Sequence, residues 1–376
     1  MQEKITVAFF LPSLEPGGTE RNVVNLVNAI DKKFYAVTLV LQKAEGDFLK
    51  NINRDIPVVN LHASGSLGLF FALTGYFKKE KPDIFVSAFA RINVICVLAK
   101  IWSRVGTKVV ITEHSVFSFL PVIAKTPLRR LFARFFMPNI ARFVYPKADA
   151  IICVSQGIAD DLKKIITSRD MRVIYNPIIS DDIFRLAEEV VGHPWFTNKN
   201  VPVIVAAGRL VPCKDYPTLL KAFSLVLAKQ PVRLVILGRG TEEHRLKKMA
   251  DELGIVKNTD FLGFQENPFK YMAGASLFVL SSLQEGFGNV IIEAMACGAP
   301  VVSTDCPAGP GEIITQRVSG LLVPVGNPSA LAESMLKVLH DSALAHMLSF
   351  AGKKRAQDFL VEKSVAEYQK VFAELL

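Results

Sequence analysis

A chain of 376 residues is too long for one ordinary hydrophobic core, so two domains are expected. Half of its residues are hydrophobic, yet no run of 18 or more apolar residues occurs, which argues against a membrane-spanning helix. The formal net charge of +9 indicates an anionic partner of one of three kinds: nucleic acid, a membrane surface or a phosphorylated ligand.

The cysteines and the first residues bear on the compartment. Five cysteines occur without a C-x-x-C pair, so reduced buried thiols are expected rather than a disulfide framework or a zinc site. The opening stretch MQEKITVAFFLP has the character of a first strand, and no signal peptide is expected. We therefore expect a cytoplasmic protein, and a peripheral location on the inner face of the cytoplasmic membrane stays open.

Short apolar runs alternate with helical patterns along the chain. Runs rich in Val and Ile on both faces are typical of parallel strands covered by helices. The predicted strands form two series: 5–11, 37–42, 83–89, 108–114, 150–155 and 172–176, then 201–210, 232–238, 259–264, 277–282 and 300–305. Predicted helices between and after them include 20–30, 215–229, 242–253, 288–297 and 328–340. This alternation predicts an α/β fold with two doubly wound domains, and the polar segment 190–202 is the candidate seam.

Four glycine-bearing loops each follow a predicted strand and lead into a helix: 14–22, 208–215, 237–243 and 285–289. Glycine lets backbone N–H groups approach a ligand, and the start of a helix favours an anion. A tight structural turn is the alternative for each loop, but all four are expected at the same edge of their sheets. There is no Walker A loop and no full G-x-G-x-x-G, which disfavours a dinucleotide cofactor.

Charged residues in these loops suggest the ligand. Arg209 and Lys214 suit a diphosphate, although two solvated loop cations would look the same in sequence. Glu285 precedes a predicted helix and Glu293 lies inside it, too far along the rise to share one metal ion. They fit two points of an extended ligand rich in hydroxyls; the alternatives are a salt bridge for Glu293 and a solvated loop residue for Glu285. Because D-x-D is absent, metal chelation of a nucleotide diphosphate is not expected.

Together these stretches resemble glycosyltransferase family 4, whose members are retaining enzymes. EGFGNVIIE resembles the family's E-x7-E motif, AAGRLVPCKDYPTLLKAF its diphosphate-binding segment, and EPGGTERNVVNLVNAI its first glycine-rich loop. ITEHS matches the place of its donor-site histidine, and VIYNPI its exit from the first domain. The resemblance covers nearly the whole chain, with the motifs in the expected order.

The resemblance implies a GT-B architecture, in which two Rossmann-like domains face each other across a cleft and the C-terminal helix crosses back to the first domain. The implied domains are an N-terminal acceptor-binding domain, 1–180 with about 357–376, and a C-terminal nucleotide-sugar-binding domain, 181–356. No cofactor and no metal are implied beyond the nucleotide sugar itself.

The residue roles carry over position by position. Arg209 and Lys214 would hold the donor diphosphate, Glu285 would bind the transferred sugar, and His114 would lie near its 6-position; these four form the implied catalytic set. The implied donor-binding positions are Gly17, Gly18, Phe287, Gly288, Asn289, Glu293, Gly238 and Phe264. Among them Glu293 would bind the ribose and the backbone of 287–289 the sugar, while Gly238 and Phe264 are candidates for the base edge. A purely structural histidine is the alternative for His114.

The implied reaction is metal-independent transfer of a hexose or N-acetylhexosamine, with retention, from a UDP-sugar. The acceptor would be a glycan or a polyprenyl-diphosphate or lipid A-type molecule, because CPAGPGEII and HPWF resemble members that build bacterial surface glycans such as lipopolysaccharide or capsule. Two alternatives stay open: a nucleotide-sugar 2-epimerase and a non-catalytic scaffold that binds a nucleotide sugar.

The segment 116–148 contains six basic residues and no acidic one: Lys125, Arg129, Arg130, Arg134, Arg142 and Lys147. Leu and Phe residues interleave with them at helical spacing, as in a helix that lies on an anionic membrane. The alternative is an apolar face packed in the core with its arginines in solvent. Nucleic acid is not expected, because no nucleic-acid-binding module is recognised.

Overall fold

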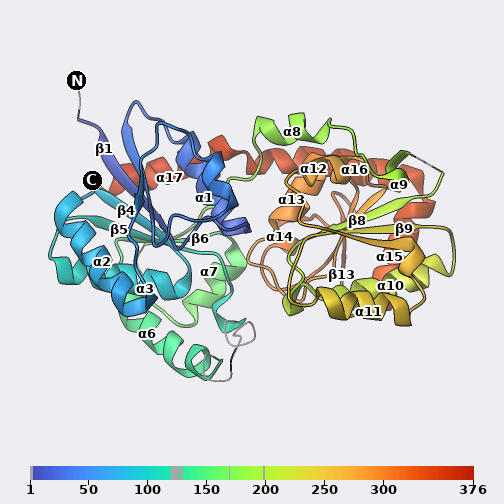
Figure 1. The fold of residues 1–376 in the computed structure, drawn as a ribbon, viewed down its shortest axis with the longest axis horizontal. Coiled ribbons are helices and arrows are strands. Elements are labelled where there is room, and N and C mark those ends of the chain that lie inside the picture. Colours follow the sequence, from blue (N-terminus) through green and yellow to red (C-terminus); the bar gives the residue numbers. More distant parts are fainter. Residues whose placement is uncertain (1–2, 120–125, 127–129, 169, 198–199) are drawn as a thin grey trace. The chain divides into compact units, whose positions relative to one another are not determined.

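The computed structural model describes residues 3–119, 126, 130–168, 170–197 and 200–376 (Figure 1). The chain forms two compact units. The first contains Met1–Pro177 together with Val361–Leu376, and the second contains Ile178–Leu360. Each is described below by itself.

The first unit is built on a parallel sheet of seven strands in the order β3-β2-β1-β4-β5-β6-β7. The strands are β1 (Ile5–Leu11), β2 (Tyr35–Leu41), β3 (Val58–Asn60), β4 (Ile84–Ala88), β5 (Lys108–Glu113), β6 (Ala150–Cys153) and β7 (Met171–Val173). The central strands are buried along almost their whole length, which explains their continuous apolar sequences.

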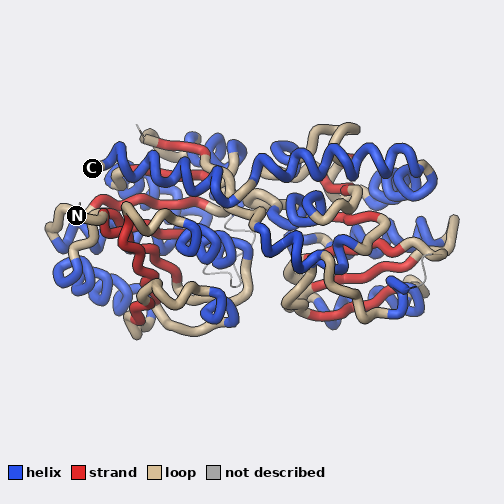
Figure 2. The backbone as a smooth tube through the Cα atoms, turned by 90° about the horizontal axis from the view of Figure 1, so that it is seen from above, coloured by secondary structure: helices blue, strands red, loops and turns tan. Residues whose placement is uncertain are grey.

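Helices cover both faces of this sheet (Figure 2). They are α1 (Gly18–Ala29), α2 (Gly65–Glu80), α3 (Ala90–Ser103), α6 (Met137–Val144), α7 (Gln156–Lys163) and α17 (Val361–Leu375). On one face, α1 and α17 pack in a common core with Phe9 of β1. On the other face, Phe77 of α2 packs against Phe85 of β4 with ring centroids 4.7 Å apart. The alternation of side chains along a strand thus gives the sheet two cores.

The C-terminal helix α17 belongs to the first unit, which confirms the expectation that it crosses back. Phe372 contacts the rings of Phe9 and Tyr35, with centroids 6.4 and 5.9 Å away. Ser364 Oγ also donates to the carbonyl oxygen of Tyr175 over 2.8 Å. Helical periodicity alone left the partner of this helix undetermined, because an amphipathic face does not say which core it covers.

The second unit has a parallel six-stranded sheet in the order β10-β9-β8-β11-β12-β13. Its strands are β8 (Val203–Ala207), β9 (Arg233–Leu237), β10 (Thr259–Gly263), β11 (Leu277–Leu280), β12 (Val301–Thr304) and β13 (Leu321–Val323). Its helices are α8 (Asp181–Ala187), α9 (Pro194–Thr197), α10 (Tyr216–Leu227), α11 (Glu243–Glu252), α12 (Phe269–Ala273), α13 (Asn289–Ala296), α14 (Pro310–Ile313), α15 (Pro328–His340) and α16 (Ser342–Ala356). The α/β class with two doubly wound sheets is therefore confirmed.

Each predicted strand overlaps an observed one, and the sheets add the short strands β3 and β13 at two of their edges. The polar segment 190–202 lies within the second unit rather than where the chain changes unit, at Pro177 and Ile178. Part of it is fixed there, since His193 Nε2 lies 3.0 Å from Asp260 Oδ2 of β10.

Candidate functional site

Both sheets reverse their strand order beside their first strand. In the first unit β1 lies between β2 and β4, and in the second β8 lies between β9 and β11. In open parallel sheets, ligands bind beyond the carboxyl ends of the strands at this switch point. The candidate site residues lie in loops at the carboxyl ends of these strands and of their neighbours in the two sheets.

In the second unit, a buried ion pair joins the loops after β8 and β11. Lys214 Nζ lies 2.5 Å from Glu285 Oε1, and the two side chains are only 14% and 10% exposed. Ser282 Oγ donates to the same carboxylate oxygen over 2.6 Å, and Ser281 Oγ donates to the carbonyl oxygen of Lys214 over 2.9 Å. The structure thus brings together two of the four residues of the implied catalytic set. A lysine ammonium has three N–H donors, so Lys214 keeps donors for a further acceptor.

Arg209 lies in the same loop as Lys214, directly after Gly208, and its side chain is exposed. Gly208 has a φ of 152°, and Gly238 of the loop after β9 has a φ of 136°. A Cβ added to Gly238 would lie 2.0 Å from the carbonyl oxygen of Gly208. The glycine at 238 is therefore required by the close approach of two loops, whatever role it has toward a ligand.

Helix α13 begins after Gly288, which has a φ of 100°. Glu285 precedes the helix, Asn289 is its first residue, and Glu293 lies buried within it. The side chain of Phe287 is buried and contacts the ring of Phe359, with centroids 5.5 Å apart, so a ligand would meet its backbone rather than its ring. The remaining candidate of this unit, Phe264, follows β10 and is half-buried.

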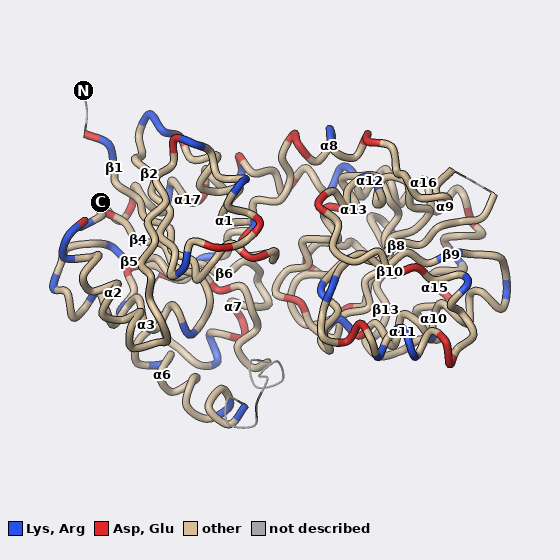
Figure 3. The backbone as a smooth tube through the Cα atoms, in the orientation of Figure 1, with Lys and Arg blue, Asp and Glu red and all other residues tan. Residues whose placement is uncertain are grey.

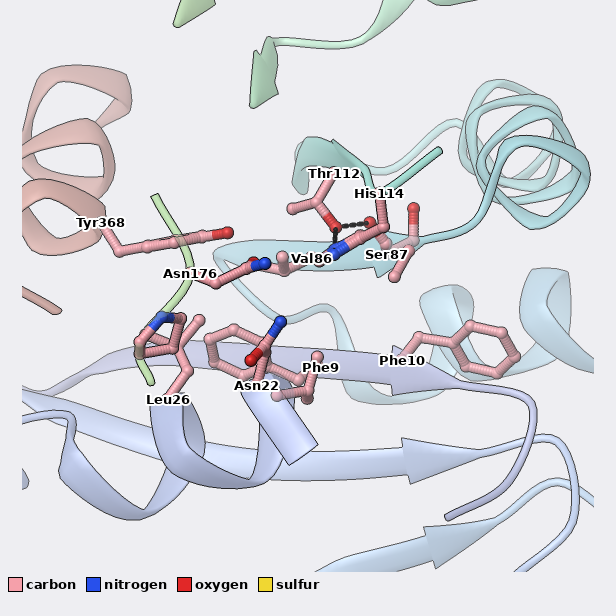
Figure 4. Close-up of a pocket in the computed structure, with 13 residues that line it drawn as sticks. Phe9, Phe10, Asn22, Leu26, Val86, Ser87, Thr112, His114, Asn176 and Tyr368 are labelled. Atoms are coloured by element: carbon pink, nitrogen blue, oxygen red, sulfur yellow. Dashed lines mark hydrogen bonds between the residues drawn. The ribbon is translucent and has the colours of Figure 1, made fainter. Parts of the chain in front are cut away.

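In the first unit, a pocket opens at the switch point (Figure 4). Its walls come from β1, α1, β4, the end of β5, the segment after β7 and α17, and its lining residues are Phe9, Phe10, Asn22, Val23, Leu26, Val86, Ser87, Ala88, Thr112, His114, Asn176, Pro177 and Tyr368. The imidazole of His114 is half-buried, and Nε2 lies 3.0 Å from Thr112 Oγ1. Burial lowers the pKa of His114 to about 4, so this ring is neutral at physiological pH.

The predicted glycines 17 and 18 lie after β1, at the start of α1. Their helix contributes to the pocket through Asn22, Val23 and Leu26. The predicted site residues thus divide between the units: Gly17, Gly18 and His114 lie in the first, and the others lie in the second.

Sequence reasoning missed Glu113, the last residue of β5. Its carboxyl group is buried, Oε1 accepts a hydrogen bond from Asn93 Nδ2 over 2.7 Å, and the hydroxyl of Tyr145 donates to the same oxygen. Burial raises the pKa of Glu113 to about 7 against the opposing effect of these hydrogen bonds. A signal was present, because a carboxylate that ends the apolar run KVVIT needs a partner inside the domain.

Among the described residues, no group of three or more His, Cys, Asp and Glu side chains is arranged to hold a metal ion. Within that same part of the chain, no helix is both long and apolar enough to cross a membrane. The five cysteines are free thiols.

Two Rossmann-like units, each built on a doubly wound parallel sheet, are the two domains expected of a GT-B glycosyltransferase. The family comparisons agree: residues 16–182 match the model described as Glycosyltransferase Family 4, and residues 193–355 match that of Glycosyl transferases group 1. The chain belongs to glycosyltransferase family 4.

By their names, one relative acts on an undecaprenol-linked glycan and another takes part in lipopolysaccharide core biosynthesis. One is the Campylobacter jejuni N-acetylgalactosamine-N,N'-diacetylbacillosaminyl-diphospho-undecaprenol 4-alpha-N-acetylgalactosaminyltransferase, 30% identical over 94% of this chain and 95% of its own. The other is the lipopolysaccharide core biosynthesis glycosyltransferase LpsE of Rhizobium meliloti, 26% identical over 89% of each chain.

Among solved structures, Anabaena Alr3699/HepE in complex with UDP and glucose is similar to this chain with a TM-score of 0.79 and 23% identity, over 98% of this chain and 100% of that one. A glycosyltransferase from Rickettsia africae has a TM-score of 0.79 and 18% identity, over 99% and 98%. These likenesses establish the fold.

Proposed function

We propose that the protein is a retaining, metal-independent glycosyltransferase that moves a hexose or N-acetylhexosamine from a UDP-sugar to a lipid-linked glycan. Such a reaction belongs to the synthesis of a bacterial surface polysaccharide. The relatives that act on undecaprenol-linked and lipopolysaccharide glycans support the acceptor, and the HepE complex supports the UDP donor.

The observation that carries the proposal is the Lys214–Glu285 pair. The ammonium of Lys214 is held within a loop cluster at the switch point, where negative charge on a leaving diphosphate would develop. Arg209 adds a second cation from the same loop. Together the two side chains carry the double positive charge that a divalent metal ion supplies in metal-dependent enzymes. Glu285, already an acceptor for Ser282 and Lys214, offers its second oxygen to a sugar hydroxyl.

Ligand binding and product analysis test this function. Thermal unfolding would be followed without added metal, with UDP, UDP-glucose, UDP-N-acetylglucosamine and UDP-N-acetylgalactosamine. A ligand that binds the native state raises the midpoint. We expect a shift with UDP and a larger one with one of the UDP-sugars, followed by transfer to an undecaprenyl-diphosphate-linked glycan with retained configuration. A strict magnesium requirement, an inverted product, or an epimerised nucleotide sugar formed without acceptor would contradict the proposal.

We also propose that the first unit docks on an anionic membrane. A π-helix, η3 (Phe132–Phe136), leads directly into α6. Four aromatic side chains in this segment are 43–71% exposed: Phe132, Phe135, Phe136 and Phe143. The side of this segment that packs inward presents smaller or other apolar residues: Ala133, Met137, Ala141 and Val144. The alternative expectation, in which the Phe and Leu side chains pack in the core, therefore does not describe these four phenylalanines, because they face outward.

Basic side chains accompany these exposed rings. Arg130, Arg134 and Arg142 lie in the same segment, where no acidic residue occurs among the described positions (Figure 3). Lys125 and Arg129 lie outside the described residues. Exposed aromatic rings beside arginines match an interface of headgroups and acyl chains.

Liposome co-sedimentation tests the docking. We expect binding to vesicles that contain phosphatidylglycerol, weaker binding to neutral vesicles, and at least a tenfold loss for a Phe135→Ser, Phe136→Ser double variant, because two apolar side chains leave the interface. Phe350→Ser is the control, since Phe350 of α16 is even more exposed, at 69%, but belongs to the second unit. Equal binding of the double variant and the wild type would contradict the docking surface.

A further inference from the structure

A network of hydrogen bonds among buried residues of the first unit extends to the pocket. It begins at Glu113 and Asn93, which are both fully buried. Asn93 Nδ2 donates to Glu113 Oε1 over 2.7 Å and to the carbonyl oxygen of Thr112 over 3.0 Å. Because both partners are acceptors, they fix which end of the Asn93 amide is the nitrogen. Asn93 Oδ1 then accepts from Ser87 Oγ over 2.8 Å.

The next link is the hydroxyl group of Thr112, which is also buried. Its single hydrogen is donated to the carbonyl oxygen of Ser87 over 3.0 Å. Nε2 of His114 lies 3.0 Å from the same hydroxyl oxygen (Figure 4). A hydroxyl has one donor and two acceptor positions, so Thr112 can meet both partners only when Nε2 carries the hydrogen and donates it.

The state of His114 follows from the two hydrogen bonds of the Thr112 hydroxyl. The ring is neutral, because burial disfavours its charged form. A neutral imidazole with its hydrogen on Nε2 has an unprotonated Nδ1, which is only an acceptor. Within the described part of the chain, Nδ1 makes no hydrogen bond, and the ring lines the pocket.

We propose that Thr112 is the positioning residue that holds His114 as the Nε2–H tautomer, which leaves Nδ1 as the acceptor for the sugar hydroxyl that the family resemblance places beside this histidine. This inference rests on the proposed function, and it narrows the donor class. The hydroxymethyl group of a hexose can donate a hydrogen bond to Nδ1. The carboxylate of a uronic acid only accepts hydrogen bonds, so neither the carboxylate nor Nδ1 would have a partner.

The tautomer is measured directly by NMR of the ligand-free protein labelled with 15N-histidine. The chain has six histidines, and the spectrum of a His114→Gln variant identifies the signals of His114. At neutral pH we expect a protonated Nε2, an unprotonated Nδ1, and an Nε2–H hydrogen that exchanges slowly with water. A hydrogen on Nδ1 of the wild type would overturn the proposal.

Two substitutions of Thr112 separate positioning from packing. Thr112→Ser keeps the hydroxyl, and Thr112→Val keeps the shape but loses it. We expect the Ser variant to retain the slow Nε2–H signal, and the Val variant to lose it with about a tenfold fall in kcat/KM, because a buried donor loses its acceptor. An unchanged signal and rate in Thr112→Val would overturn the role of Thr112. If Thr112→Val fails to fold, the wild-type tautomer and the Thr112→Ser signal still decide.

The ligand side is tested by thermal shift with UDP-glucose and UDP-glucuronate. We expect at least tenfold weaker binding of the uronate. Equal binding would overturn the assignment of Nδ1 to a sugar hydroxyl. If neither ligand binds although His114 has the expected tautomer, the proposed UDP-sugar donor is contradicted, whereas the positioning role of Thr112 is still supported.

Discussion

The two units stabilise a carboxyl group of low solvent exposure in opposite ways. In the second unit, Glu285 is paired with the ammonium of Lys214 and a hydroxyl, so the site keeps its charges. In the first unit, Glu113 accepts hydrogen bonds from a phenol and an amide, with no cation among its partners in the described residues, and burial raises its pKa to about 7. The partner of each carboxyl group thus decides whether it stays charged, both for Glu113 at the end of β5 and for Glu285 in the loop after β11. The charged site suits a diphosphate, and the neutral one suits hydroxyl groups.

The comparison predicts its largest effect at Lys214. Removal of its ammonium takes away positive charge where the leaving group develops negative charge, and we expect Lys214→Ala to lower kcat about 100- to 1000-fold. The measurement is the initial rate of transfer from the UDP-sugar that gives the largest thermal shift. Lys221→Ala is the matched control, because Lys221 is exposed on the neighbouring helix α10. Equal rates for both variants would remove the charged site from the reaction.

The neutral site predicts a dependence of stability on pH. The pKa of Glu113 is about 7 in the folded chain against an ordinary value of 4.5. The stability that protonated Glu113 provides is therefore complete below about pH 4.5 and is lost as the pH rises through 7. Cys153 and Tyr145 also face this carboxyl group, but burial raises the pKa of both thiol and phenol, so neither titrates in this range.

Glu113→Gln keeps an acceptor and removes the titration. We expect the variant to gain up to roughly 3 kcal/mol relative to the wild type between pH 5 and pH 8. Urea unfolding of the first unit measures this, with Trp195 replaced by Phe so that Trp102 of α3 reports. A pH-independent difference between the two proteins would show that Glu113 is not kept protonated.

A double-mutant cycle gives the strength of the charged pair itself. Loss of one partner leaves the charge of the other buried and unpaired. The destabilisations of the second unit by Lys214→Met and by Glu285→Gln should therefore add up to more than the destabilisation by the double variant. We expect a coupling free energy of about 2 kcal/mol. Urea unfolding followed by Trp195 in a Trp102→Phe background measures it. Additive effects would mean that the short Lys214–Glu285 contact contributes no stability.

The smallest expected effect concerns His114. Its pKa of about 4 lies below the ordinary 6.5, so its stabilising neutral form is fully present above pH 6.5 and is lost as the pH falls toward 4. Between pH 7 and pH 5.5 the wild type should lose about 1 kcal/mol relative to His114→Asn, which does not titrate. The same urea experiment on the first unit applies. An ordinary pKa for His114, seen by NMR, would contradict the neutral site.

Much of the charged site could be predicted from sequence, and most of the neutral one could not. Lys214 and Glu285 lie in loops after strands, and the strand order of a doubly wound sheet brings such loops together. Glu113, Asn93 and Tyr145 come from a strand, a helix and a short turn whose meeting depends on packing that no local pattern encodes. The short edge strands β3 and β13 were missed for a related reason, since three residues carry too little periodicity.

The return of α17 to the first unit makes the second unit an insertion. The two connecting passages run side by side, because Ile179 and Leu360 form a parallel bridge and Ile178 N–H donates to the carbonyl oxygen of Phe359 over 3.3 Å. Ile178–Leu360 is therefore continuous in sequence and could be excised whole, whereas the first unit is assembled from both ends of the chain. A truncation of the last sixteen residues would leave the second unit intact but would uncover Phe9 and Tyr35, which lie near the other end of the sequence.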